Sequence, residues 1–505
     1  MKFDSAWERS VLHRPELLTP GQMGRADALA PSLGVAGPAL MDNAGRAVAR
    51  AIRQRFRPCR TLVLCGPGNN GGDGYGIARR LQQEGWPVTV ASLSPPKPGT
   101  DAAGAAAGWN GPMVAFGPDQ AVRAGLVVDA VFGAGLSRDV DGLVAATLAA
   151  ASRIVAVDVP SGLDGQSGAI RGFAPQVLLT VTFFRLKPGH LLLPGRGLCG
   201  ELVLADIGMP AVLDYIATDC RINLPSLWRV PSPATVGHKY DRGHVTILGG
   251  ATMTGAARLA AEAARRAGAG MLTIAAQTNA ELYRSGAPGV IVDEQDLKTL
   301  LRDPRRKTWV CGPGLGVDAA RQALPVLLAS GRQVLADADA FSTAAGNPAA
   351  LRGAAVITPH EGEFVRVFGP IGADRVQAAR LAARLSGAVV LLKGADTVIA
   401  APDGQARINA SAPPWLATAG AGDVLSGIIA GLLAQGMTPF DAASAGAWLH
   451  GRAATLAGPG MLAEDIAPML ANAIAQSGVK SSGVVQSGIT EYHSFTRDER
   501  LPGKL

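Results

Sequence analysis

Two long stretches of the chain alternate short β-branched runs with alanine-rich helical stretches, and this alternation is the strongest constraint on the fold. Successive β-α units of this kind pack around a mostly parallel sheet. The first stretch predicts strands at Thr61–Cys65, Pro87–Ser92, Leu126–Val131, Ile154–Val159, Val177–Phe183 and Glu201–Asp206. The second predicts strands at Val245–Leu248, Met271–Ala275, Trp309–Cys311, Val334–Ala336, Ala355–Ile357 and Val389–Lys393, then a hairpin within 397–409. The chain therefore belongs to the α/β class.

The regular alternation stops between residues 210 and 240, where four prolines interrupt it. This break predicts an N-terminal domain over residues 1–220 and a C-terminal domain over residues 221–480. The polar, serine-rich residues 481–505 predict a disordered tail. Residues 94–112 are rich in proline, glycine and alanine and predict a connection with little regular structure.

Charge and cysteine content narrow the functional classes. The net charge is +7, but the basic residues form only short clusters, so we expect no nucleic-acid partner. The five cysteines lack CxxC or Cys/His metal spacing, which argues against disulfides and structural zinc and favours a reducing compartment. No secretory signal and no membrane-spanning apolar run is visible, so the sequence predicts a cytoplasmic protein without a membrane partner.

A glycine-rich loop, Gly66 to Gly74, lies between the first predicted strand and the next helix. In parallel α/β sheets this position binds phosphates, because glycines allow close approach and the helix N-terminus offers N–H groups. The alternative is a tight turn without a ligand. Two asparagines and Asp73 within the loop favour a binding role, although the loop is neither a P-loop nor a GxGxxG sequence.

Polar residues also follow two further strands of the first stretch. Asp129 ends one strand, and Asp158 and Ser161 follow another. Strand carboxyl ends share one edge of a sheet, so these groups and Asn70 should meet in one crevice. Taken singly, each aspartate could instead cap a helix. Amide, hydroxyl and carboxylate oxygens together suit a monovalent or alkaline-earth cation better than zinc.

These motifs, NNGGDG, DAVFGAGL and DVPSGL in this order, resemble the NAD(P)H-hydrate epimerase family over about residues 10–220. The resemblance implies a Rossmann-like three-layer fold and a potassium ion held by Asn70, Asp129 and Ser161. It also implies substrate contacts from Asp158 and from two loops, whose residues are Asn69, Asn70, Gly71, Gly72, Asp73, Gly133, Ala134, Gly135, Leu136, Ser137, Arg138 and Asp139.

The implied reaction interconverts the R and S hydrates of NADH and NADPH at C6 of the nicotinamide ring. It needs transient loss of the hydroxyl and therefore an acid/base group within reach. We expect Asp158 in this role. Lys187, in the stretch FFRLKPG, is a second candidate, and the alternative for Lys187 is a surface or phosphate-facing lysine.

The second stretch contains a glycine-rich turn, Thr418 to Asp423, before a predicted helix. Its backbone N–H groups would form an anion hole, and Asp423 could take a proton from a hydroxyl that attacks a phosphate. The Gly-Ala-Gly-Asp pattern is typical of ribokinase-like folds. The alternative is an aspartate that caps the helix after a flexible turn.

Other strand-end motifs accompany this turn. LKGADT is a candidate nucleotide contact, and TPHEGE places His360 and Glu363 toward the crevice. Taken in order with GPGLG and GGATMTGAA, they resemble the ADP-dependent NAD(P)H-hydrate dehydratase family over about residues 225–480. The resemblance implies that ADP phosphorylates the S hydrate, that phosphate then leaves, and that AMP is released.

The resemblance to the dehydratases also implies roles for individual residues. Asp423 would be the base, and the hydrate would contact Ala256, Gly314, His360 and Asp423. The nucleotide would contact Lys393, Gly394, Ala395, Asp396, Thr397 and Gly422. Asp396 departs from the small residue usual at its position. Magnesium and a homo-oligomer are expected with this family.

Two rival functions fit parts of the sequence. A vitamin or sugar kinase of ribokinase type, using ATP, would explain Gly420 to Asp423 but not the first stretch. A non-catalytic cofactor-binding module would leave Asp158 without a chemical role. The two motif sets together favour a bifunctional repair enzyme for hydrated NADH and NADPH.

Overall fold

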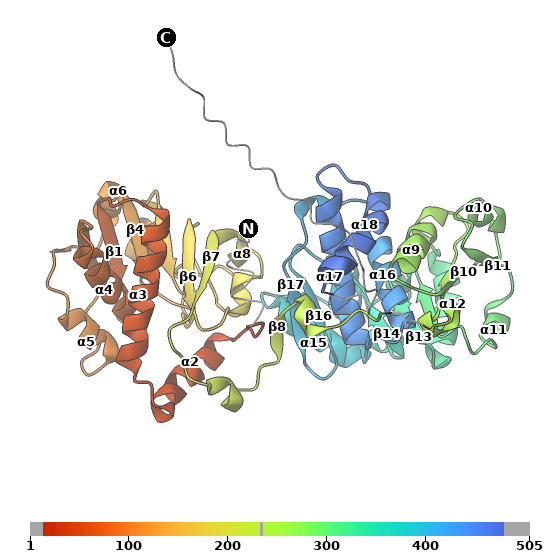
Figure 1. The fold of residues 1–505 in the computed structure, drawn as a ribbon, viewed down its shortest axis with the longest axis horizontal. Helices are drawn as coiled ribbons and strands as arrows, with labels where there is room; N and C mark the ends of the chain where they lie inside the picture. Colours follow the sequence, from red (N-terminus) through yellow and green to blue (C-terminus); the bar gives the residue numbers. More distant parts are fainter. Residues whose placement is uncertain (1–13, 233–235, 479–505) are drawn as a thin grey trace, which may run out of the picture.

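The computed structural model describes residues 14–232 and 236–478, which form two parallel-rich sheets side by side, each flanked by helices (Figure 1). The first sheet lies in the N-terminal half and the second in the C-terminal half. This arrangement confirms the α/β class and two units of similar style. Residues 481–505, predicted to be a disordered tail, lie outside the described residues.

The first sheet has seven strands in the order β3-β2-β1-β4-β5-β6-β7, and all its pairings are parallel. Its strands are β1 (Thr61–Cys65), β2 (Val88–Ser92), β3 (Met113–Val114), β4 (Leu126–Ala130), β5 (Ile154–Val157), β6 (Leu179–Phe183) and β7 (Glu201–Ala205). The helices of this half are α2 (Pro20–Leu29), α3 (Gly37–Arg55), α4 (Asn69–Gln83), α5 (Asp101–Ala107), α6 (Pro118–Arg123), α7 (Gly142–Ala149) and α8 (Gly195–Leu198).

Alternate residues of β1 point into two different cores, as the pleat of a strand requires. Val63 packs with Val48 of α3 and Ile77 of α4, whereas Leu64 packs with Leu148 of α7 on the opposite face. Helices therefore cover both faces of the sheet. This confirms the predicted Rossmann-like three-layer fold.

The second sheet has ten strands in the order β11-β10-β9-β12-β13-β14-β15-β16-β17-β8. Its strands are β8 (Cys220–Ile222), β9 (His244–Leu248), β10 (Met271–Ala275), β11 (Ile291–Asp293), β12 (Thr308–Cys311), β13 (Gln333–Ala336), β14 (Ala354–Ile357), β15 (Val389–Leu392), β16 (Thr397–Ala400) and β17 (Ala406–Asn409). The strands from β9 to β15 pair in parallel with one another in the sheet. β16 is antiparallel to β15 and forms the predicted antiparallel hairpin with β17.

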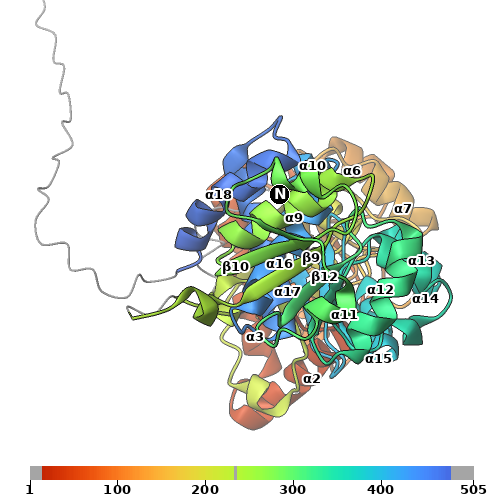
Figure 2. The same cartoon turned by 90° about the vertical axis from the view of Figure 1, so that its right-hand side faces the viewer.

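Ten helices of the described C-terminal residues cover the second sheet (Figure 2). They are α9 (Thr254–Arg266), α10 (Ala280–Arg284), α11 (Leu297–Leu300), α12 (Val317–Ala329), α13 (Asp339–Thr343), α14 (Glu361–Phe368), α15 (Arg375–Ser386), α16 (Ala421–Ala434), α17 (Pro439–Ala457) and α18 (Ala463–Gln476). Helices α9, α16, α17 and α18 share one core with the sheet, and α12, α14 and α15 share the core on the other face.

Two segments differ from the sequence prediction. Residues 94–112 contain α5, because Thr100 caps the N-terminus of an alanine-rich run through a hydrogen bond from the Ala103 N–H. The irregular stretch 210–240 contains β8, which pairs in parallel with β17. The predicted boundary between residues 220 and 221 falls inside β8, and the domain limits stay a prediction. In the described parts of the chain, no helix has both the length and the apolar character needed to span a bilayer.

The two halves are in direct contact. Leu17, Leu186 and Leu192 of the N-terminal half belong to the same apolar core as Ile222 and Val398 of the C-terminal half. Polar contacts join the halves as well: Gln166 Nε2 donates to Asp374 Oδ2 at 2.7 Å, the Leu193 N–H donates to Asp396 Oδ2 at 2.9 Å, and Arg196 Nη1 donates to the Ala395 carbonyl at 2.9 Å.

Candidate active sites

The first candidate site lies at the carboxyl ends of β1, β4 and β5, which are neighbours in the sheet. The loop after β1 packs closely on the end of β4. A Cβ at Gly66 would lie 1.9 Å from the Val131 carbonyl oxygen, and a Cβ at Gly71 would lie 1.9 Å from the Gly66 carbonyl oxygen. Only glycine permits these approaches, and α4 begins directly in this loop at Asn69.

Asp129 and Ser161 form a buried pair at this edge. Ser161 Oγ donates to Asp129 Oδ1 at 2.6 Å, and the Ser161 N–H donates to Asp129 Oδ2 at 2.8 Å. Burial raises the pKa of Asp129, although its hydrogen bonds with Ser161 oppose the rise. Asn70 is nearby in the loop, and its Nδ2 is buried without a hydrogen-bond partner in the described structure.

These oxygens suit a hard, weakly charged cation. Asn70 Oδ1, the Asp129 carboxylate and Ser161 Oγ are oxygen donors of mixed charge, as such a cation prefers. Within residues 14–232 and 236–478, no cluster of three or more His, Cys, Asp or Glu side chains could hold a metal ion. The predicted donor set is therefore of the kind that a hard monovalent or alkaline-earth cation accepts.

Asp158 is the most connected group of the first site. Its backbone has a φ of 68°, rare for a residue other than glycine. Lys187 Nζ donates to its Oδ1 at 2.5 Å, Thr182 Oγ1 donates to the same oxygen at 3.0 Å, and the Ala134 N–H donates to Oδ2 at 3.0 Å. Burial alone would raise the pKa of Asp158, but the Lys187 ammonium outweighs it and lowers the pKa to about 2.

Lys187 is not the surface lysine that the sequence left open. Its side chain is only 2% exposed, and its Nζ also contacts Thr182 Oγ1 at 2.8 Å. His190 Nδ1 accepts from the Lys187 N–H, and His190 Nε2 lies 2.9 Å from the Asp158 carbonyl oxygen. Burial lowers the pKa of His190 to about 4, so the imidazole is neutral at pH 7 and donates to that carbonyl.

Two more carboxyl groups lie close to this pair. Burial raises the pKa of Asp73 well above its ordinary value, and the charges of Asp158 and Asp27 add to the rise. Burial also raises the pKa of Asp27 on α2, against the opposing effect of Lys187. Asp27 was missed by the sequence analysis, because it lies on a helix before the first strand. The site thus contains Asp158, whose pKa is lowered, beside Asp73, whose pKa burial raises.

The predicted loop after β4 closes over the same crevice. A side chain at Gly133 would lie 3.2 Å from Asp158 Oδ2 and 3.4 Å from Asn70 Oδ1. Farther along this loop, the Arg138 guanidinium lies over the Phe132 ring at 5.5 Å. The structure thus brings Asn70, Gly133 and Asp158 together as the strand-end argument predicts. The remaining predicted contacts lie in the first turn of α4 (Asn69, Gly71 and Gly72) and in the loop after β4 (Ala134, Gly135, Leu136, Ser137 and Asp139).

The second candidate site lies where β13, β14 and β15 end near the N-terminus of α16. Lys393 Nζ donates to Asp337 Oδ1 at 2.8 Å and lies 3.7 Å from Glu363 Oε2. Ser426 Oγ donates to Asp337 Oδ2 at 2.7 Å. A Cβ at Gly422 would lie 3.6 Å from Lys393 Nζ, so the predicted residues Lys393 and Gly422 are neighbours.

Asp423 faces this network of charges. Burial raises its pKa to about 6, with a further contribution from the Asp337 charge. A carboxylate with such a pKa is a stronger base than an ordinary aspartate and is still mostly ionised at pH 7. This property suits the role of general base that the sequence predicts for Asp423.

The other predicted hydrate contacts come from separate elements: His360 from the start of α14, Ala256 from α9, and Gly314 from the turn after β12. His360 Nδ1 accepts from the Gly362 N–H at 3.0 Å and caps α14, while His360 Nε2 lies 3.4 Å from Glu363 Oε1. A Cβ at Gly314 would lie 2.9 Å from the Ala256 Cβ, so these two residues form one small-residue surface. His360 thus lies beside the charged network through Glu363, and Ala256 lies against Gly314.

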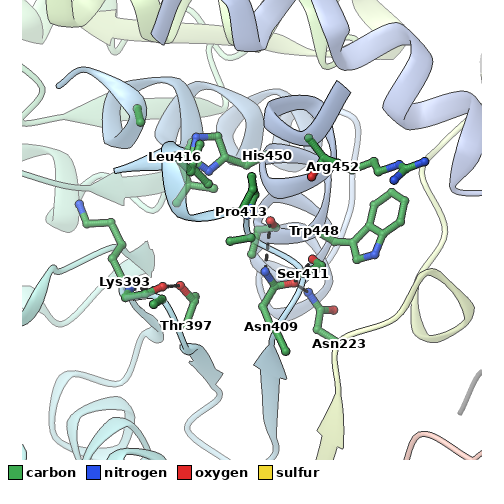
Figure 3. A pocket seen from close by; sticks show the side chains of 18 of the residues that line it. Asn223, Lys393, Thr397, Asn409, Ser411, Pro413, Leu416, Trp448, His450 and Arg452 are labelled. Atoms are coloured by element: carbon green, nitrogen blue, oxygen red, sulfur yellow. Dashed lines mark hydrogen bonds between the residues drawn. The ribbon is translucent and has the colours of Figure 1, made fainter. Parts of the chain in front are cut away.

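A cavity of about 1530 Å³ opens beside this network (Figure 3). Lys393 and Thr397 line one wall, and Trp448 and Arg452 lie across from them. His450 also lines the cavity; its Nε2 is buried without a partner in the described structure, and burial lowers its pKa to about 4. His450 carries no recognisable sequence motif, since it lies in the middle of the long helix α17.

Asp396 is placed differently from the other members of its predicted loop. Lys393, Gly394, Ala395 and Thr397 line the cavity. The Asp396 side chain instead accepts from the Leu193 N–H and lies 3.5 Å from Arg375 Nε. This contact with the N-terminal half explains why an acidic residue is tolerated at a position where a small one was expected.

Each of the two α/β units has a polar crevice at the carboxyl ends of its parallel strands, and each crevice contains a carboxylate with a shifted pKa. These features define an enzyme with two separate catalytic sites. Residues 245–476 match the family model described as NAD(P)H-hydrate dehydratase, and residues 37–189 match the model of the YjeF-related protein N-terminus. The chain belongs to the family of bifunctional NAD(P)H-hydrate repair enzymes.

Relatives cover almost the whole chain. It is 39% identical over 487 residues to the bifunctional NAD(P)H-hydrate repair enzyme Nnr of Moorella thermoacetica, with 86% of this chain and 91% of that protein covered. The enzyme of the same name from Escherichia coli is 37% identical over 453 residues, with coverage of 85% and 87%. An ADP/ATP-dependent NAD(P)H-hydrate dehydratase from Bacillus subtilis, co-crystallized with ATP/Mg2+, is 29% identical with a TM-score of 0.44 and covers 49% of this chain and 95% of its own.

Proposed function

We propose that the N-terminal site interconverts the R and S hydrates of NADH and NADPH and that the C-terminal site dehydrates the S hydrate at the expense of ADP. The observation that carries this proposal is the pair of separate crevices, one with Asp158 beside Lys187 and one with Asp423 beside Lys393. Damage that yields both epimers then becomes repairable by one chain, since the first site supplies the epimer that the second consumes.

Epimerisation needs a proton donor for the hydroxyl and a charge to stabilise the ring cation left behind. Burial raises the pKa of Asp73 well above its ordinary value, so we assign the role of proton donor to Asp73 and not, as expected from the sequence, to Asp158. Asp158 stays ionised and stabilises the cation, and Lys187 positions its carboxylate. Water then adds to the other ring face and returns the proton to Asp73, so the reaction is balanced without a redox partner.

A potassium ion would be held by Asn70, Asp129 and Ser161. When bound, it would supply a fixed positive charge beside the substrate loops. The hydrogen bonds between Ser161 and Asp129 orient the oxygens of these two donors. The two loops over 69–73 and 133–139 would contact the hydrate, as the sequence predicts.

At the second site, Asp423 takes the proton from the C6 hydroxyl as its oxygen attacks the β-phosphate of ADP. AMP leaves, and the hydroxyl becomes a phosphate ester. Phosphate is a much better leaving group than hydroxide, so it departs from C6 with loss of a ring proton and the nicotinamide double bond returns. His360, Ala256 and Gly314 would contact the hydrate, and the stretch 393–397 with Gly422 would contact the nucleotide.

Magnesium would neutralise charge on the transferred phosphate, which is its general role in phosphoryl transfer. The only partners proposed are small molecules: the hydrates of NADH and NADPH, and ADP. A cytoplasmic homo-oligomer without nucleic-acid or membrane partners remains our expectation.

The test is recovery of NADH absorbance from a mixture of R and S hydrates with ADP. The wild type should convert the whole mixture. Asp423→Asn should abolish recovery, whereas Asp158→Asn should consume the S hydrate and then slow to the rate of spontaneous epimerisation. A wild type that phosphorylates a sugar or vitamin with ATP and leaves the hydrates unchanged would replace this proposal with the kinase alternative.

A further inference from the structure

The cavity beside the second site is lined by cations that differ in whether a carboxylate already pairs with them. Besides His360 and His450, four charged side chains line it: Arg196, Glu361, Lys393 and Arg452. Glu361 is paired with Arg375 at 2.6 Å, and Lys393 is held by Asp337 and Glu363. Lys393, the cation predicted to bind the nucleotide, is therefore already neutralised by two carboxylates.

Arg196 comes from the other half of the chain. It lies on α8, after β6 of the first sheet, and is half-buried at the contact between the halves. Its Nη1 donates to the Ala395 carbonyl at 2.9 Å, which fixes the guanidinium against the loop predicted to contact the nucleotide. The side chain is thus held at the cavity wall by a backbone oxygen and not by an acid.

No carboxylate neutralises this guanidinium within 4.0 Å in the part of the chain that the structure describes. Burial lowers the pKa of Arg196, and Asp396 partly opposes the shift. Both Asp396 oxygens are engaged elsewhere, one by the Leu193 N–H and one near Arg375. A partly desolvated cation without an anionic partner gains the most from an anionic ligand.

Arg452 is the other lining cation without an acidic partner, but its position is less suitable. Its guanidinium is hydrogen-bonded to Gln476, and Figure 3 places it across the cavity from Lys393. Arg196 instead contacts the loop over 393–397 directly, through its hydrogen bond to the Ala395 carbonyl. The two observations together favour Arg196 as the group that meets a phosphate.

We infer that Arg196, a residue of the N-terminal half, completes the nucleotide site of the C-terminal half by binding a phosphate of the nucleoside diphosphate. This inference rests on the proposed ADP-dependent dehydration. The contact between the halves then becomes part of the second site. The N-terminal half would produce the S hydrate at its own site and would also provide Arg196 to bind the nucleotide. Arg196 touches the nucleotide and not the reacting C6 hydroxyl, so its role is in ADP affinity.

The test is steady-state dehydration of the S hydrate by the full-length chain with varied ADP. Arg196→Gln should raise the KM for ADP about tenfold, since a charge-assisted hydrogen bond contributes about that factor, and should change kcat by less than twofold. Arg196→Lys, which keeps the charge, should recover most of the affinity. Arg302→Gln removes an equally charged but exposed arginine far along the chain and is the matched control.

Two further measurements separate phosphate binding from a structural role. Raising the salt concentration should increase the KM for ADP more in the wild type than in Arg196→Gln, because screening weakens a charge contact. Adenosine, used as an inhibitor, should bind the wild type and Arg196→Gln equally. An unchanged KM for ADP in Arg196→Gln, or equal losses in Arg196→Gln and Arg196→Lys with a matching fall in melting temperature, would overturn the inference. A wild type without ADP-dependent activity would instead refute the proposed function.

Discussion

Removing the Lys187 ammonium should lower the stability of the first sheet, and the pKa of Asp158 allows the size of this loss in free energy to be estimated. Lys187 is 2% exposed and donates to Asp158 Oδ1 at 2.5 Å. The pKa of Asp158 falls from 3.8 to about 2 in this environment, and each unit corresponds to about 1.4 kcal/mol. After the cost of burial, the environment of Asp158 thus favours the ionised carboxylate by a net of about 2 kcal/mol, and breaking a buried pair by deleting one partner typically costs about 3–5 kcal/mol.

We therefore expect Lys187→Met to lower the local stability around β4 and β5 by about 3 kcal/mol. Without Lys187, burial dominates and the pKa of Asp158 rises. The double variant Lys187→Met, Asp158→Asn should recover at least half of the loss, because no buried charge remains unpaired. Hydrogen exchange with mass spectrometry on peptides over 126–131 and 154–163 measures this local stability.

The pH dependence has a fixed sign. Asp158 has a depressed folded-state pKa, so its contribution is fully present above its unfolded pKa of 3.8 and is lost as the pH falls toward about 2. Wild-type protection from exchange should therefore lose this contribution only below about pH 4. A double variant as unstable as Lys187→Met would refute the electrostatic explanation, since the loss would then come from packing of the lysine stem.

Two further outcomes follow from the sites. Because burial and Asp337 raise the pKa of Asp423 to about 6, kcat for dehydration should fall about tenfold per unit below pH 6 and level off above it; a profile flat down to pH 5 would exclude Asp423 as the base. Potassium chloride should raise the melting temperature of the wild type above its value in equimolar sodium chloride, and Ser161→Ala should reduce this difference by removing the hydroxyl that joins Asp129 and Phe132; equal melting temperatures for the wild type in the two salts would count against the ion site.

The central strands were predictable because their residues are buried on both faces and form continuous apolar runs. β1 spans Thr61–Cys65 as predicted, and all five residues are buried. β8, in contrast, has three residues and exists because β17, nearly two hundred residues later, pairs with it. Pairing between distant segments leaves no periodic pattern in the local sequence. β8 therefore could not be predicted within its proline-rich stretch.

The same distinction applies to the sites. Asp129 and Asp158 could be found because the carboxyl ends of adjacent parallel strands share one edge, which is a property of the fold and not of distant packing. Asp27 and His450 lie on helices whose placement depends on tertiary contacts, so their spacing carries no such information. The contact of Asp396 with the other half could not be found from its local motif either, and its predicted nucleotide contact stays a prediction.

Joining the two halves in one chain keeps the two enzymes in equal amounts, and the contact between the halves also links the geometry of their two sites. Residues 188 to 192, which begin with the short helix η2 (Pro188–His190), are all buried and run from Lys187 at the first site toward Leu193 and Arg196 at the second. A buried segment cannot adjust independently at its two ends, because its neighbours are close-packed. Lys187 is fixed at one end by Asp158, and the Leu193 N–H is fixed at the other by Asp396. The contacts that orient the Asp158 carboxylate in the first site therefore also determine the position of Arg196 at the second site.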